Sequence, residues 1–191
     1  MNDKEKIVKI FKDSVDVKRS FLEDGPSVQK VVEAAGAIKD CYQRSGKLLV
    51  FGNGGSSADS QHMAAEMVVR FRKERKALAC ISLTTDTSIL TAASNDYDFS
   101  KVFVRQLEAI LRPEDLVLAI STSGISPNVV EAAKYSKKRN VPLIALTGKD
   151  GGELAKIADI PIVVRSQVTA RVQETHSVII HAICELVEEN L

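Results

Sequence analysis

The chain has 191 residues, of which 45% are hydrophobic and 27% charged, and its formal net charge is +1. This composition is typical of one globular domain, and so small a net charge gives no reason to expect nucleic acid or an acidic membrane as a partner. The apolar runs, about five residues long, are far too short to span a bilayer. No signal-peptide core is present and the three scattered cysteines read as reduced thiols, so we expect a cytoplasmic protein.

Two helical patterns come first. Apolar residues at helical spacing predict a helix over about residues 3–23, and Gly25-Pro26 ends it. Ser27 is predicted to cap a second helix that runs to about Arg44. If these helices lie outside the sheet, their apolar faces need another partner. We therefore expect residues 1–45 to lie at an oligomer interface.

Five short apolar runs then alternate with helical patterns. The predicted strands are 47–51, 77–82, 116–120, 143–146 and 160–164, and the predicted helices are 56–72, 98–111, 127–139, 152–157 and about 168–189. Most of the strands lack polar alternation, which is typical of a parallel sheet buried on both faces. The pattern predicts an α/β fold with a doubly wound sheet in a single domain over residues 1–191, with its core in 46–191.

Two loops have the composition of a phosphate site. The loop 121–124 (STSG) and the loop 52–57 (GNGGSS) each follow a predicted strand and open a helix. A helix N-terminus offers free N–H groups and a positive dipole end. The first loop lacks the lysine of a triphosphate-binding loop, and the second lacks the third glycine and the acidic residue of a dinucleotide site. A single phosphate monoester therefore fits best, and we expect no nucleotide cofactor. A plain helix cap with a glycine turn is the simpler alternative for the first loop.

The histidines fall on two predicted helices. His62 and Glu66 are four residues apart, so they share a helical face and could hold a divalent metal or act as a base with its partner. An exposed ion pair is the simpler alternative. On the last helix His176 and His181 lie on opposite sides of Gln173, and spacing alone does not decide which of them points to a site.

Two further polar stretches have simpler explanations. Asn95 and Asp96 follow a short helical run, and such residues commonly end helices and turn the chain. The basic stretch 70–76 is predicted to be the solvated end of a helix, where cations suit the dipole.

Several spaced motifs together resemble the sugar isomerase (SIS) family, and within it the phosphoheptose isomerase branch. The matching stretches are 52–66, 94–99, 119–132, 145–160 and 170–188. The resemblance implies a three-layer αβα sandwich with a five-stranded parallel sheet, assembled as a homotetramer. It also implies the isomerisation of sedoheptulose 7-phosphate to an aldoheptose 7-phosphate for activated-heptose synthesis and bacterial surface glycans such as lipopolysaccharide.

The resemblance also implies roles for individual residues. The substrate-binding residues would be Asn53, Gly54, Gly55, Glu66, Asn95, Asp96, Ser121, Thr122, Ser123, Ser126 and Gln173. The ligands of one zinc ion would be His62, Glu66, Gln173 and His181. Glu66 would act as the base and His181 as its acid/base partner. Ala170 stands where some relatives carry an acid, so a third carboxylate has no counterpart here.

Two alternatives stay open at this level. SIS domains also serve as non-enzymatic sugar-phosphate sensors and adaptors, including one that associates with a replication initiator. An adaptor needs the fold but not a carboxylate and an imidazole aimed at the sugar, so the presence of Glu66 and His181 favours an enzyme. An isomerase of another sugar phosphate differs only in pocket walls, which the sequence does not reveal.

Overall fold

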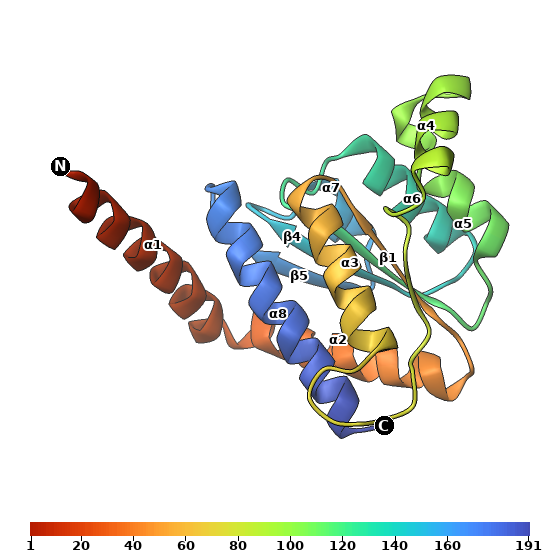
Figure 1. The fold of residues 1–191 in the computed structure, drawn as a ribbon, viewed down its shortest axis with the longest axis horizontal. Coiled ribbons are helices and arrows are strands. Elements are labelled where there is room, and N and C mark those ends of the chain that lie inside the picture. Colours follow the sequence, from red (N-terminus) through yellow and green to blue (C-terminus); the bar gives the residue numbers. More distant parts are fainter.

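The computed structural model describes residues 1–191 and has a five-stranded sheet between two layers of helices (Figure 1). The strands are β1 (Leu48–Gly52), β2 (Cys80–Ser82), β3 (Leu116–Ser121), β4 (Leu143–Gly148) and β5 (Ile160–Val164). All neighbours are parallel, in the order β2-β1-β3-β4-β5. Every residue of β1, β3 and β4 is buried, which explains why these strands show no polar alternation. The predicted three-layer α/β sandwich is confirmed.

The helices cover both faces of the sheet. On one face lie α2 (Gly25–Gln43), α3 (Gly55–Val68) and α8 (Thr169–Glu189). On the other lie α4 (Thr87–Asp96), the short 3-10 helix η1 (Phe99–Lys101), α5 (Val104–Ile110), α6 (Pro127–Lys138) and α7 (Gly152–Ile157). Each face buries its own apolar cluster against the sheet, which is the normal way for such a domain to form its core. No helix is both long and apolar enough to span a membrane.

Helix α1 (Asp3–Glu23) extends away from the sheet (Figure 1) and has no buried residue. It is held to α8 by a hydrogen bond from Arg171 Nη1 to the carbonyl of Ile10, 2.6 Å. The predicted cap of the second helix, Ser27, is wrong by three residues, because Asp24 stands at that position. Helix α2 begins at Gly25, because Pro26 suits a first helical turn, and the hydroxyl of Ser27 instead donates to Asp24.

Two other predicted boundaries are wrong. The helix predicted over 56–72 ends at Val68, and the strand predicted over 77–82 covers only Cys80–Ser82. The backbone N–H groups of residues 71–73 donate to the carboxylate of Glu188, so they cannot continue the helix. The helix predicted over 98–111 is split, because Asp98 caps η1 and α5 begins afresh at Val104.

The strand order places the two glycine- and serine-rich loops side by side. Strand β1 pairs with β2 on one side and β3 on the other, so the direction of winding reverses between β1 and β3. In open parallel sheets, ligands bind beyond the carboxyl ends of the strands at this point. The loops that follow β1 and β3 both lie there, which makes this edge of the sheet the expected binding site.

Candidate active site

The loop after β3 forms a cradle of hydroxyl and N–H groups. Ser121 Oγ lies 3.1 Å from Ser126 Oγ and 3.4 Å from Ser123 Oγ. The backbone N–H groups of Thr122, Ser123 and Ser126 have no acceptor within the protein. Because Ser126 does not cap α6 through its side chain, its hydroxyl faces the same cluster. These groups at the start of a helix can donate hydrogen bonds to the oxygens of one phosphate group.

The turn of this loop is supported by the next one. Gly124 has φ +67°, and a Cβ atom placed there would lie 2.0 Å from the carbonyl oxygen of Gly151. The carbonyl of Gly124 also accepts a 2.9 Å hydrogen bond from the N–H of Leu154. Glycine is required here because only it tolerates both the conformation and the close approach. The loops after β3 and β4 are therefore packed as one unit.

The loop after β1 is joined to α6 by a pair of amides. Asn53 Nδ2 donates to Asn128 Oδ1, and Asn128 Nδ2 donates to Asn53 Oδ1, each at 2.8 Å. Asn128 is buried in the first turn of α6. Sequence reasoning missed Asn128, and its only signal was a polar residue directly after the loop and Pro127. This pair fixes the β1 loop against the phosphate cradle.

Helices α3 and α8 run parallel beside each other and meet at three levels (Figure 1). A Cβ atom on Gly55 would lie 2.4 Å from Gln173 Nε2, and one turn further on Ser177 donates to Asp59 Oδ1, 3.1 Å. At the third level His181 Nε2 lies 3.4 Å from His62 Nε2. Each level follows the last by about one helical turn.

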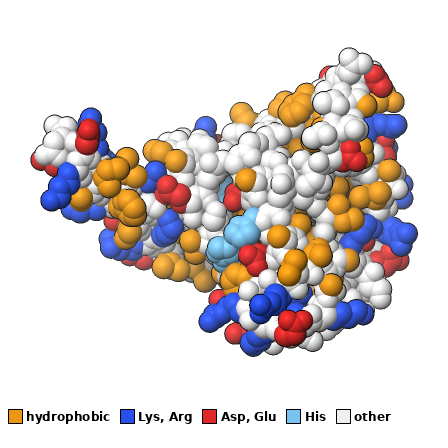
Figure 2. All heavy atoms as spheres, viewed as in Figure 1, with side chains coloured by type: hydrophobic (Ala, Val, Ile, Leu, Met, Phe, Trp, Pro, Cys, Tyr) orange, Lys and Arg blue, Asp and Glu red, His pale blue; other side chains and the backbone are white.

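The third level is a candidate metal centre. His62 Nε2 lies 3.0 Å from Glu66 Oε1, and one ligand atom from each of His62, Glu66 and His181 lies within 4.8 Å of the others. Two imidazole nitrogens that face each other beside a carboxylate are the donor set of a divalent cation such as zinc. Histidine side chains are visible on the face of the molecule shown in Figure 2, with an acidic side chain beside them. The cluster is therefore accessible from solvent.

The structure decides between the two histidines of α8. His176 is fully buried, and its Nε2 donates to the carbonyl of Thr147 at 2.9 Å. Burial lowers the pKa of His176 from 6.5 to about 4. His181, by contrast, joins the cluster of His62 and Glu66. His176 is a structural residue that holds α8 to β4.

Two of the expected site residues lie apart from these groups, and a third does not reach the metal cluster. Asn95 and Asp96 are exposed at the end of α4, and their only side-chain hydrogen bond joins them to each other. Gln173 lies two turns before His181, against Gly55, and makes no hydrogen bond with the His62–Glu66–His181 cluster. Its place beside the β1 loop suits a contact with the sugar. The metal role of Gln173 stays a prediction.

The fold and the two loops define the SIS domain, and the SIS domain model matches residues 11–148. The chain is 49% identical to phosphoheptose isomerase of Aquifex aeolicus, over 97% of this chain and 96% of that protein. Structures of phosphoheptose isomerases from Neisseria gonorrhoeae and Francisella tularensis superpose with TM-scores of 0.92 and 0.93, at 41% and 34% identity, and cover 98% and 99% of this chain and all of theirs. The chain belongs to the phosphoheptose isomerases of the SIS family.

Proposed function

We propose that this protein is an aldose–ketose isomerase that converts sedoheptulose 7-phosphate to D-glycero-D-manno-heptose 7-phosphate. The observation that carries the proposal is the convergence of Glu66 and His181, from two separate helices, within one cluster. Helix α3 begins at the glycine loop beside the phosphate cradle, about 10 Å before His62 of that cluster. A sugar chain with a phosphate at one end and a carbonyl at the other matches this separation of groups.

The phosphate end would be anchored by Ser121, Thr122, Ser123 and Ser126. Their hydroxyls and free N–H groups provide several donors without a permanent positive charge. Asn53, Gly54 and Gly55 would line the sugar with Gln173. Asn95 and Asp96, which lie apart from these groups at the end of α4, stay predicted substrate contacts. These contacts hold the substrate so that its carbonyl end reaches α3 and α8.

The chemistry would be carried by Glu66 and His181. Glu66 takes the proton from C1 of the ketose while His181 donates a proton to the oxygen on C2, which gives an enediol. Glu66 then returns a proton to C2, and His181 removes the proton from the oxygen on C1, which leaves the aldose. The proton count is unchanged over the cycle, as an isomerisation requires.

A zinc ion fits the nitrogen and carboxylate donors of His62, Glu66 and His181, with Gln173 as the fourth predicted ligand. When bound, zinc would polarise the carbonyl and stabilise the negative charge that develops on its oxygen. His62 takes no part in the proton transfers. Its role is to orient Glu66, whose Oε1 lies 3.0 Å from His62 Nε2.

The test is to incubate the protein with sedoheptulose 7-phosphate and to follow an aldoheptose phosphate by NMR. The variant Glu66→Gln keeps the shape of the side chain but removes the base, so we expect its rate to fall at least about 100-fold. Binding of inorganic phosphate to this variant should be unchanged. An adaptor protein would bind the sugar phosphate in both forms and convert it in neither, and substantial turnover by Glu66→Gln would remove Glu66 as the base.

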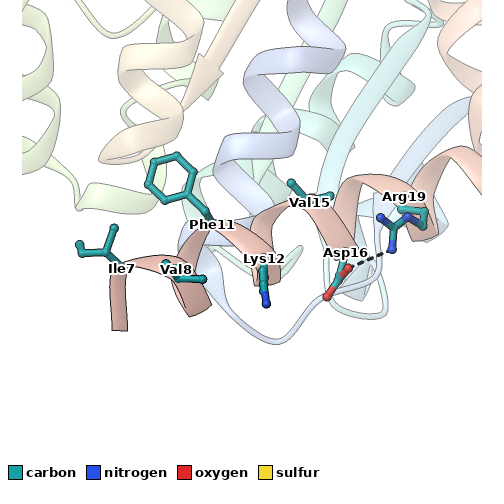
Figure 3. Close-up of a pocket in the computed structure, with 7 residues that line it drawn as sticks. All are labelled: Ile7, Val8, Phe11, Lys12, Val15, Asp16 and Arg19. Atoms are coloured by element: carbon teal, nitrogen blue, oxygen red, sulfur yellow. Dashed lines mark hydrogen bonds and ion pairs between the residues drawn. The ribbon is translucent and has the colours of Figure 1, made fainter. Parts of the chain in front are cut away.

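We also propose a homotetramer of a single SIS domain over residues 1–191, with the N-terminal helices of residues 1–45 near the interface. Helix α2 buries its apolar face in the core on the sheet, so α1 is the part that needs a partner. Apolar side chains of α1, among them Ile7, Phe11 and Val15, line an open groove of about 510 Å³ (Figure 3). Phe11 is 69% exposed, and a second copy of the chain would cover it. Light scattering should give about four chains per particle, and a stable monomer would contradict the assignment.

The proposed compartment is the cytoplasm. Cys41, Cys80 and Cys184 are buried and unpaired, as is usual where thiols stay reduced. The aldoheptose phosphate would enter activated-heptose synthesis for bacterial envelope glycans such as lipopolysaccharide.

A further inference from the structure

The segment 69–79, which connects α3 to β2, makes contacts that reach both reactive helices. At its start, the carboxylate of Glu188 on α8 accepts hydrogen bonds from the N–H groups of Phe71, Arg72 and Lys73, at 3.0, 2.8 and 2.8 Å. The same carboxylate lies 3.2 Å from Arg75 Nε. Glu188 is only 3% exposed, so this anchor is buried. The segment is thereby tied to the last turn of α8.

Further along the segment, Arg75 caps the end of α3. Arg75 Nη2 donates to the carbonyl oxygen of Glu66, and Arg75 Nη1 donates to that of Met67, each at 2.8 Å. These carbonyls belong to the last turn of α3, where no helical N–H is available to them. One guanidinium therefore binds the backbone of Glu66 and the carboxylate of Glu188 at the same time.

The segment also contacts the imidazole partner. The ring of Phe71 packs against His181, with ring centroids 5.5 Å apart. Glu188 lies seven residues after His181, so both are on the same stripe of α8. Arg75 thus binds the backbone of Glu66. Glu188 lies on the same stripe of α8 as His181, and Phe71 packs against the His181 ring.

We propose that Arg75 and Glu188 are positioning residues for the isomerase reaction, which hold Glu66 of α3 and His181 of α8 at a fixed separation. The inference rests on the proposed function, which gives these two side chains complementary proton transfers. A buried ion pair adds little net stability, because desolvation of both charges offsets their attraction. Burial also opposes ionisation of Glu188, but the three N–H donors and Arg75 outweigh it and lower the pKa of Glu188. What the pair supplies is geometry, since two guanidinium N–H groups fix the carbonyls of Glu66 and Met67 while the charge of Arg75 is held beside the carboxylate of Glu188.

The test compares Arg75→Met and Arg75→Lys with a matched control. Asp115 forms the other buried ion pair, with Lys47 at 2.7 Å, and it also accepts backbone N–H groups, but none of its hydrogen-bond or ion-pair partners lies on α3, on α8 or in the segment 69–79. Asp115→Asn should therefore lower the Tm and leave kcat within about twofold. Arg75→Met should lower kcat about tenfold or more with KM within about twofold, because the phosphate contacts are untouched. Arg75→Lys should recover only part of kcat, since an ammonium keeps the charge beside Glu188 but lacks the fork that donates to both carbonyls.

A second readout does not depend on turnover. The imidazole NMR signals of His62 and His181 should move in Arg75→Met and stay in place in Asp115→Asn. If Arg75→Met does not fold, Glu188→Gln serves instead, because one amide oxygen cannot replace a carboxylate that binds three N–H groups and Arg75. Unchanged kcat and unchanged imidazole signals in a folded variant would overturn the inference. A different result would separate the two proposals. If Arg75→Met shifted the imidazole signals but the unmodified protein never converted the sugar, the positioning role would stand and the proposed function would be refuted.

Discussion

Asn53 and Asn128 exchange two hydrogen bonds of 2.8 Å between their side-chain amides, across 75 residues of sequence. The pair joins the loop after β1 to the first turn of α6 and so sets the distance between the two binding loops. Each amide uses one donor and one acceptor, which leaves the other N–H and lone pairs for neighbours or a ligand. The relationship holds the proposed sugar site and the proposed phosphate site against each other.

Asn128→Asp should weaken substrate binding. An aspartate keeps the acceptor but loses the donor to Asn53 Oδ1, and it places a negative charge beside the phosphate cradle. We expect KM for the sugar phosphate to rise about tenfold, which corresponds to about 1.4 kcal/mol, with a smaller effect on kcat. Steady-state kinetics measure this. Asn140→Asp adds the same charge at an exposed site after α6 and should change neither constant; equal effects of the two variants would contradict the proposed role of the pair.

Removal of metal should lower both activity and stability. After dialysis against a chelator, added zinc should restore turnover and raise the Tm, since a ligand bound to the native state at 100 times its Kd adds about 2.7 kcal/mol. His62→Ala should lose the zinc-dependent rise in Tm, because it removes one donor of the cluster. His176→Gln should keep the rise, since His176 is bound to Thr147 instead. A zinc effect on Tm that survives in His62→Ala would place the metal elsewhere.

Stability should fall in mild acid because of His176. Burial lowers its pKa from 6.5 to about 4, so between these values the unfolded chain holds a proton that the folded chain does not. The stabilising contribution is complete above pH 6.5 and is lost as the pH falls towards 4, by about 1.4 kcal/mol per pH unit.

His176→Gln should remove this dependence while its amide still donates to Thr147. Denaturant unfolding of both proteins at several pH values between 4 and 7.5 measures the difference. The raised pKa of Asp59, caused by burial, acts in the opposite direction, but it is present in both proteins and cancels in the comparison. If the free energy of unfolding changed with pH in the same way for both proteins, His176 would not titrate as described.

Two glycine substitutions should have opposite effects. Gly124→Ala puts a methyl group 2.0 Å from the Gly151 carbonyl at a φ of +67°, so we expect a loss of more than about 1 kcal/mol and weaker phosphate binding. Gly36→Ala lies in the exposed interior of α2 with no atom within 4 Å, and we expect a gain of about 0.5–1 kcal/mol. Thermal unfolding and phosphate titration measure both. A neutral Gly124→Ala would show that the loop can move away from β4.

The sequence by itself determined the class of the fold and the position of the binding loops. Unbroken apolar runs predict buried parallel strands, and β1, β3 and β4 lie close to where these runs predict them. The loops at Gly52 and Ser121 follow from the glycine and hydroxyl residues that come directly after two of these strands. The pairing of His62 with Glu66 also follows from one helix, since four residues make about one turn.

The tertiary structure decided everything that depends on two distant segments. The choice of His181 over His176 required the parallel packing of α8 on α3, because the two histidines lie at similar angles on either side of Gln173 around the helix. The end of α3 at Val68 and the burial of Arg75 depend on Glu188, more than a hundred residues later, and they contradict the predicted solvated helix end. Local spacing encodes the face of a helix, but which face meets which neighbour is set only when the chain packs.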